Sequence, residues 1–164
     1  MEVLALQFKD WDLQVSPQYG ACILSCSYRG FDILRKAEAS WKYTHDPMLS
    51  SYFPLVPYSN RIANGQFKWE DKSFNLKPNH SGQKFPLHGI GWLSEWAVKD
   101  IKENSCSLEY KHIEGDWPWP FLVRQKIVLE DSSIKISLTL NNMGKKIVKG
   151  ENIAQAFQFI NSGN

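Results

Sequence analysis

The sequence has few cysteines, and their spacing does not suggest a metal or disulfide framework. Cys22, Cys26 and Cys106 are the only three in 164 residues. An odd count without paired, closely spaced ligands is not typical of a disulfide-stapled fold or a structural zinc site. We therefore expect three reduced, mostly buried thiols, and we expect neither a metal nor another cofactor.

Long apolar runs and an excess of charge of one sign are also missing. The first ten residues, MEVLALQFKD, contain neither the basic region nor the apolar region of a secretion signal. No window approaches the roughly 20 apolar residues of a membrane-spanning helix. The net charge is +2 and the lysines are scattered, so we expect no nucleic-acid partner and no membrane partner. These features predict a cytoplasmic protein.

Aromatic residues, in contrast, are abundant. They make up 13% of the chain and include seven tryptophans. Large rings bury much surface in a core and also provide flat platforms for ligands, so their number favours a binding cleft. The length fits one domain, which we expect to comprise residues 1–164.

Alternation of apolar and polar residues predicts an all-β protein. It occurs in residues 20–28, 31–36, 66–70, 74–77, 106–113, 121–129 and 133–140. Turn residues join these segments, with Arg29-Gly30 in the first hairpin and residues 71–73 in the second. Gln125 interrupts an otherwise apolar strand face. Strands of period two joined by such turns are typical of an antiparallel β-sandwich.

Two long segments keep no period. Residues 37–59 and 77–92 are rich in proline, glycine and polar residues, and we expect long ordered loops, where binding residues tend to lie. Near the end of the chain, Ile153, Phe157 and Ile160 have helical spacing, whereas Phe157 and Phe159 would share one strand face. Both interpretations of that segment stay open.

Two short motifs resemble those of the aldose 1-epimerase (galactose mutarotase) family. The segment Asn60-Arg61-Ile62-Ala63-Asn64-Gly65-Gln66-Phe67 is similar to the family pattern N-R-I-x-x-G-x-F, and Leu87-His88-Gly89, followed by Trp96, is similar to its L-H-G segment. In such motifs Gly65 and Gly89 would occupy turns. The resemblance implies an antiparallel β-sandwich of the galactose-mutarotase type. It also implies cofactor-free interconversion of the α and β anomers of free aldoses such as glucose or galactose.

The chemistry of this reaction suits the residues in the motifs. Ring opening needs a base at the anomeric hydroxyl and an acid at the ring oxygen, and histidine serves both roles near neutral pH. By resemblance, His88 is the catalytic candidate, and Arg61 would grip sugar hydroxyls with its planar fork. Asn60, Asp116 and Trp92 complete the expected substrate-binding set, with Asn60 also bracing the loop backbone.

The resemblance ends before the end of the chain. No histidine follows His112, and no carboxylate matches the family's C-terminal glutamate, so the second histidine and the glutamate that the family implies have no counterpart. We therefore expect a truncated sandwich with a divergent segment at 147–164, and little or no mutarotase activity for the chain as written. The apolar row Ile134, Ile136 and Leu138 would then be open to water or available for self-association. The alternatives are a non-catalytic sugar-binding module, an inactive fragment, and a half-enzyme completed by a partner chain.

Overall fold

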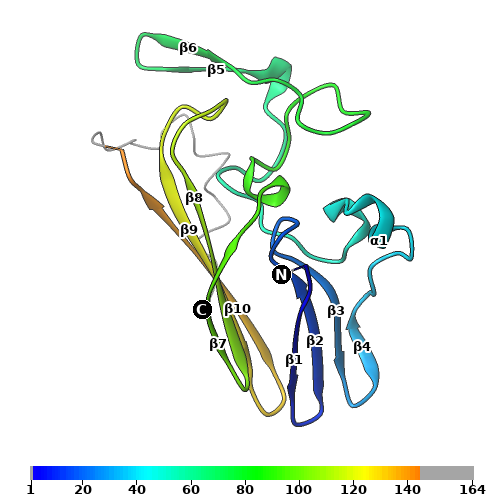
Figure 1. Ribbon diagram of the computed structural model, residues 1–164. Coiled ribbons are helices and arrows are strands. Elements are labelled where there is room, and N and C mark those ends of the chain that lie inside the picture. The colour runs from blue at the N-terminus through cyan, green and yellow to red at the C-terminus, as the bar shows by residue number, and fades with distance from the viewer. Residues whose placement is uncertain (1, 145–164) are drawn as a thin grey trace.

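Within residues 2–144, the protein forms two antiparallel four-stranded sheets and a separate hairpin (Figure 1). The computed structural model describes residues 2–144. Sheet A contains β1 (Leu4–Phe8), β2 (Trp11–Ser16), β3 (Cys22–Tyr28) and β4 (Phe31–Leu34) in that order. Sheet B contains β7 (Ala97–Lys102), β8 (Ser105–His112), β9 (Phe121–Leu129) and β10 (Ile134–Asn142), and β5 (Gln66–Trp69) pairs with β6 (Lys72–Asn75). The all-β expectation is confirmed.

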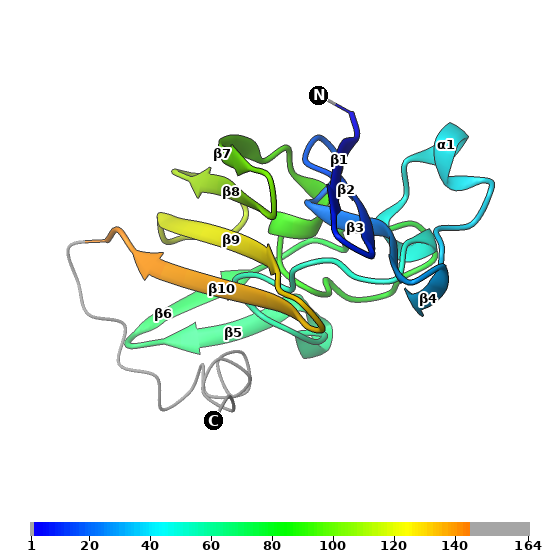
Figure 2. The same cartoon turned by 90° about the horizontal axis from the view of Figure 1, so that it is seen from below.

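Local sequence explains how most strands pair. The hairpin β3–β4 turns at Arg29 and Gly30, whose φ angles are 52° and 79°, as a two-residue hairpin turn requires. β9 has the predicted bounds, and its long ladder with β10 places Gln125 opposite Leu138. Figure 2 shows β7 and β10 at opposite edges of sheet B.

Some strands differ from the sequence-based expectation. β1, β2 and β7 were not predicted. β1 and β2 do alternate buried and exposed residues, but β7 is exposed along almost its whole length, so its sequence has no apolar row. In the β5–β6 hairpin the turn consists of Glu70 and Asp71 rather than residues 71–73. Glu70 adopts a positive φ of 51°, and the tight turn aligns Phe67 with Phe74.

Sheets A and B bury their inner faces against each other. One cluster of buried side chains draws on both sheets, with Leu13 and Ile23 from sheet A and Leu108, Val123 and Ile127 from sheet B. All five side chains are almost completely buried. This arrangement is the expected sandwich. Three buried cysteines contribute to the interior, and burial raises the pKa of Cys22 and of Cys106 to about 11.

Gln125 is the polar exception on the inner face of β9. Its side chain is 0% exposed. Its Nε2 donates to the carbonyl oxygen of Ala21 at 3.1 Å, and its Oε1 accepts from the Tyr52 hydroxyl at 3.3 Å. The residue that interrupts the apolar pattern therefore links sheet B to sheet A and to the following loop. Buried polar groups are tolerated when they are paired in this way.

The apolar row on β10 is more covered than expected. Ile134, Ile136, Leu138 and Leu140 are partly buried and pack against the main core. The row is therefore partly covered and partly open to water, and self-association through it stays a prediction.

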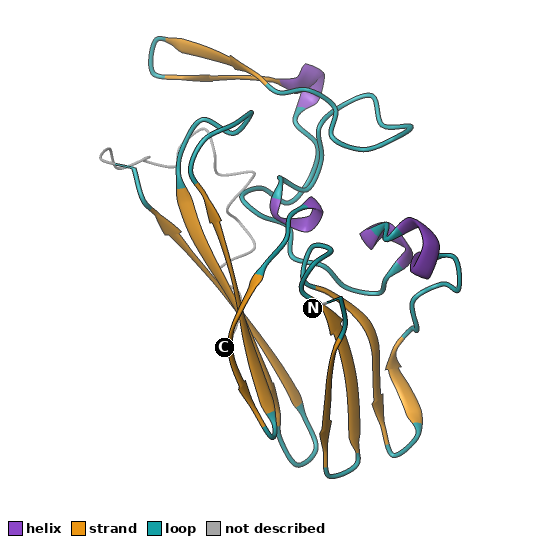
Figure 3. Cartoon of the chain, viewed as in Figure 1, coloured by secondary structure: helices purple, strands orange, loops and turns teal. Residues whose placement is uncertain are grey.

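The two long loops position the site. Residues 37–59 contain only the one-turn helix α1 (Trp41–Thr44) and a 3-10 turn at Pro47–Leu49, and residues 77–92 contain no strand (Figure 3). The expectation of ordered loops is thus confirmed, apart from these short turns. No helix within residues 2–144 has the length and apolar character needed to cross a membrane. The segments 147–164 and 152–160, on which the sequence left questions open, lie outside the described residues.

Replacing Gln125 with alanine will destabilise the fold. The change leaves the Ala21 carbonyl and the Tyr52 hydroxyl unpaired and opens a cavity, which together cost about 2–4 kcal/mol of unfolding free energy. Urea unfolding followed by tryptophan fluorescence measures this loss. The matched control is Lys126→Ala, at the exposed neighbour on β9, which is expected to change stability by less than about 0.5 kcal/mol. Equal effects of the two substitutions would contradict the bridging role.

Candidate functional site

The two sequence motifs lie side by side as paired loops. Residues 56–62 and 86–91 are joined by backbone hydrogen bonds, including His88 N–H to the Asn60 carbonyl at 3.2 Å. Two successive N–H groups of the second loop donate to the Val56 carbonyl at 2.9 and 3.0 Å. Residues 56–62 and 86–91, which are far apart in the sequence, thus form one rigid wall of the site.

His88 and Gly89 have a left-handed backbone. Their φ angles are 59° and 71°. A Cβ atom at Gly89 would overlap the carbonyl oxygen of Val56, so only glycine fits there. A positive φ is uncommon for a residue with a side chain, although histidine adopts it more readily than most residue types. The turn directs the imidazole away from the core.

Hydrogen bonding fixes the orientation of the His88 ring. Its Nδ1 lies 2.6 Å from the Ser59 carbonyl oxygen. Because a carbonyl oxygen only accepts, Nδ1 carries the proton, and in the neutral ring Nε2 is the acceptor. Nε2 makes no hydrogen bond to another residue of the described chain. Phe53 and Trp92 contact the ring edge-on, each with centroids 5.8 Å from it.

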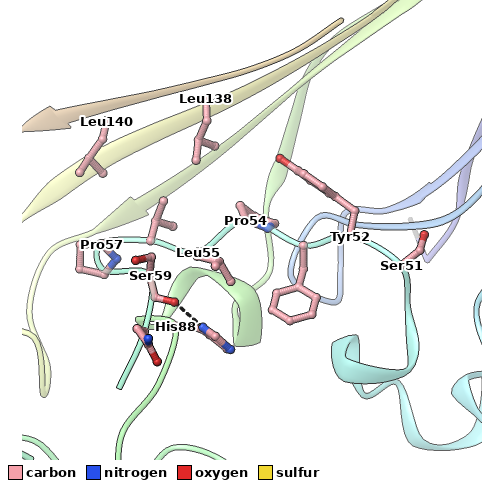
Figure 4. Close-up of a pocket in the computed structure, with 12 residues that line it drawn as sticks. Ser51, Tyr52, Pro54, Leu55, Pro57, Ser59, His88, Leu138 and Leu140 are labelled. Carbon is pink, nitrogen blue, oxygen red and sulfur yellow. Dashed lines mark hydrogen bonds between the residues drawn. The ribbon is translucent and has the colours of Figure 1, made fainter. Parts of the chain in front are cut away.

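His88 lines a pocket of about 670 Å³ (Figure 4). This volume is in the range of small-molecule sites. Its walls are the loop before the first motif and the inner face of β10. The lining residues are Ser51, Tyr52, Phe53, Pro54, Leu55, Val56, Pro57, Ser59, Asn60, His88, Leu138 and Leu140. An apolar wall thus faces a small polar group around the histidine.

Trp92 supports the site from behind. It is 0% exposed, and its Nε1 donates to the carbonyl oxygens of Leu87 and Gly89 at 3.2 and 3.1 Å. Phe53 stacks on its ring at 5.3 Å. With one face covered and no exposed surface, Trp92 offers no platform to a sugar. Its role in this structure is to hold the backbone on both sides of His88, which corrects the expectation of direct contact.

Asn60 and Arg61 are placed differently. Asn60 lines the pocket, and its Oδ1 accepts the backbone N–H of Arg61 at 2.8 Å. The guanidinium of Arg61 is exposed and donates to Gln83 Oε1, at 2.8 Å from one terminal nitrogen and 3.3 Å from Nε. The backbone of Arg61 bridges Leu87, but its side chain is not among the lining residues. The structure thus places His88 and Asn60 in the same pocket, whereas the guanidinium of Arg61 lies outside it.

Asp116 connects to the site through Tyr58. The carboxylate is exposed, whereas Tyr58 is buried and contacts the backbone N–H of Gly89. Burial, followed by the negative charge of Asp116, raises the pKa of Tyr58 to about 12. Asp116 does not line the pocket.

Some contributors to the site were not predicted from the sequence. Ser59 acts through a backbone carbonyl, which no residue pattern reveals. Phe53 belongs to an irregular proline-rich segment. Asn79 forms three hydrogen bonds to Leu87 and Gly89, and its only signal was an amide in a loop before the second motif. No group of three or more His, Cys, Asp or Glu side chains gathers within residues 2–144, so no metal ligand set is assigned.

Comparison with known families agrees with the two motifs. A family model for aldose 1-epimerase matches residues 12–149. The matched range includes both motif loops and all of sheet B.

Characterised and uncharacterised relatives match over part of their length. The chain is 29% identical over 140 residues to the aldose 1-epimerase of Haemophilus influenzae, covering 81% of the chain and 38% of that protein. It is 34% identical over 95 residues to the uncharacterized protein YphB of Escherichia coli K12, covering 58% of the chain and 32% of that protein. The chain therefore spans about a third of the length of these curated relatives.

Solved structures show the same architecture. An aldose 1-epimerase-type protein from Escherichia coli K12 superposes with a TM-score of 0.78 at 29% identity, covering 87% of the chain and 46% of that structure. A galactose mutarotase-like protein from Clostridium acetobutylicum gives a TM-score of 0.72 at 18% identity, with 87% and 46% covered. The fold is that of the galactose mutarotase-like proteins.

The bond from His88 to Ser59 predicts an unusual tautomer. The neutral ring will carry its proton on Nδ1, whereas free neutral histidine favours Nε2. Long-range ¹H–¹⁵N correlation spectra of the labelled protein distinguish the two nitrogens directly. A neutral His88 protonated on Nε2 would show that the contact with the Ser59 carbonyl is not formed in solution.

Proposed function

The chain belongs to the aldose 1-epimerase family, and from this premise we propose that its pocket binds a free aldose and assists the interconversion of its anomers. Family membership supports a mutarotase-like function, and a sugar is the substrate class that it implies. The Haemophilus influenzae relative carries the name of that activity. Glucose and galactose are the first substrates to test.

The observation that carries the proposal is the fixed orientation of His88. Its Nδ1 is held by the Ser59 carbonyl at 2.6 Å, and the ring lines the pocket. Nε2 therefore accepts the proton of the anomeric hydroxyl while the bond from C1 to the ring oxygen breaks. Solvent water protonates the ring oxygen and takes this proton back in the reverse step. After rotation about C1–C2, the steps reverse on the other carbonyl face. A positioned group of this kind accelerates proton transfer by roughly 10²–10⁴-fold.

The remaining walls suit a pyranose. Leu138 and Leu140 offer apolar contact to the C–H face of the ring, and Asn60 offers an amide to its hydroxyls. In this proposal, Arg61 joins the bound sugar by exchanging the Gln83 oxygen for substrate hydroxyls, since both are neutral acceptors for a guanidinium fork. Asp116 and Trp92 act indirectly, through Tyr58 and the backbone around His88.

A non-catalytic sugar-binding role is the second candidate, and the pocket itself favours it. Among its lining residues only His88 and Tyr52 titrate, and burial raises the pKa of Tyr52 to about 12. Histidine is the residue type that commonly serves as an acid or base, and His88 is the one histidine among the lining residues. A single acid–base group supports binding and weak catalysis better than rapid turnover.

Polarimetry tests the catalytic proposal. With freshly dissolved α-glucose or α-galactose, we expect at most a small acceleration proportional to protein concentration, in keeping with the low activity expected from the sequence. It should fall to the buffer rate in His88→Ala because the proton acceptor is lost. The control is His45→Gln, at a histidine outside the pocket that packs on Tyr19. Acceleration that survives in His88→Ala would disprove the assigned role. Saturable sugar binding without acceleration would identify the binding module.

Fluorescence titration tests Arg61. Sugar bound near His88 is expected to quench tryptophan emission saturably, because Trp92 packs against that ring. Arg61→Ala should weaken binding by roughly tenfold or more, since a charge-assisted hydrogen bond contributes about 1.5–3 kcal/mol. Arg29→Ala, at an exposed arginine of the β3–β4 turn, is the matched control and should leave the affinity unchanged. Identical affinities for the Arg61 and Arg29 variants would remove Arg61 from the binding set.

A further inference from the structure

Asn79 binds the backbone on both sides of His88. Its Nδ2 donates to the Leu87 carbonyl at 2.8 Å and to the Gly89 carbonyl at 2.6 Å. Its Oδ1 accepts the N–H of Leu87 at 2.9 Å. One amide thus uses both donors and its acceptor on the two neighbours of the candidate catalytic residue.

The same two carbonyls also accept from Trp92. The indole N–H lies 3.2 Å from the Leu87 oxygen and 3.1 Å from the Gly89 oxygen. Leu87 and Trp92 are fully buried. Each carbonyl therefore has two donors in a region with little water, and a carbonyl that lost its partners there could not easily find others.

Asn79 is itself held in place by its neighbour. His80 Nε2 lies 3.1 Å from Asp46 Oδ2, in the turn after α1. The His80 ring also packs against Trp92, with centroids 5.3 Å apart. The amide is consequently anchored to a part of the fold that lies outside both motif loops.

We propose that Asn79 is a positioning residue, which sets the left-handed backbone of His88 and thereby fixes the orientation of its imidazole at the pocket. The φ of 59° at His88 is less favourable than an extended or helical backbone for a residue with a side chain, and the bonds from Asn79 stabilise it. The Leu87 carbonyl belongs to the peptide plane before His88, and the Gly89 carbonyl belongs to the plane after Gly89. These bonds therefore hold the peptide planes at both ends of the left-handed His88–Gly89 pair. The ring then meets the Ser59 carbonyl in one orientation only. The catalytic consequence rests on the proposed function, whereas the structural one does not.

The first test is Asn79→Ala in the full chain, with Asn75→Ala at an exposed residue of β6 as the control. In the alanine variant of Asn79, we expect the neutral His88 ring to become a mixture of Nδ1-H and Nε2-H tautomers. We also expect backbone amides 87–89 to exchange with solvent at least tenfold faster. Asn75→Ala should reproduce the parental spectra. An unchanged tautomer and unchanged exchange in a folded Asn79→Ala protein would overturn the proposal.

A second measurement uses the unaltered protein, in case Asn79→Ala does not fold. Both side-chain amide protons of Asn79 are expected to exchange much more slowly than those of Asn75, because each is bound to a carbonyl. Equal exchange rates would overturn the proposal. Polarimetry and sugar titration are then run on the parental chain. If the tautomer responds to Asn79→Ala but the parental chain neither binds nor converts sugar, the positioning role stands and the proposed function fails.

Discussion

The site depends on the conformation of two residues, His88 and Gly89. Their left-handed backbone lets the imidazole face the pocket while the neighbouring carbonyls turn inward to Asn79 and Trp92. Gly89 must lack a side chain because Val56 approaches so closely. Everything else at the site is arranged around this turn: the paired loops hold it from one side, and the buried indole holds it from behind. The sandwich supplies the rigid base, and the turn sets the orientation of the imidazole.

Much of the fold could be predicted because side-chain alternation reports directly on burial. β9 has the bounds expected from its sequence, and the Arg29-Gly30 turn has the backbone that a tight hairpin needs. β7 could not be found in this way. It is an edge strand with one face in water and little apolar surface on the other, so its pairing with β8 rather than its own composition makes it a strand. Alternation in a sequence reveals a strand that buries one face, and an edge strand such as β7 buries too little of either face to show it.

The site was predictable only where a motif named its residues. The motifs correctly brought residues 60–62 and 87–89 together, because their backbones pair. They could not show what each side chain does there. The Arg61 guanidinium bonds Gln83 outside the pocket, and Trp92 is buried rather than offered to a ligand. Ser59 and Asn79 contribute through hydrogen bonds to or from main-chain atoms. These bonds depend on tertiary geometry and cannot be recognised from the periodicity of the sequence. Residue identity was therefore easier to infer than residue role.

The buried amide of Gln125 has an effect beyond holding the sheets together. It accepts from the hydroxyl of Tyr52, and Tyr52 is part of the pocket wall. One hydrogen bond thus connects the interior of the sandwich to the wall of the pocket. A substitution at position 125 would therefore disturb both the packing between the sheets and the support of Tyr52, whereas the exposed neighbour Lys126 has no part in this connection.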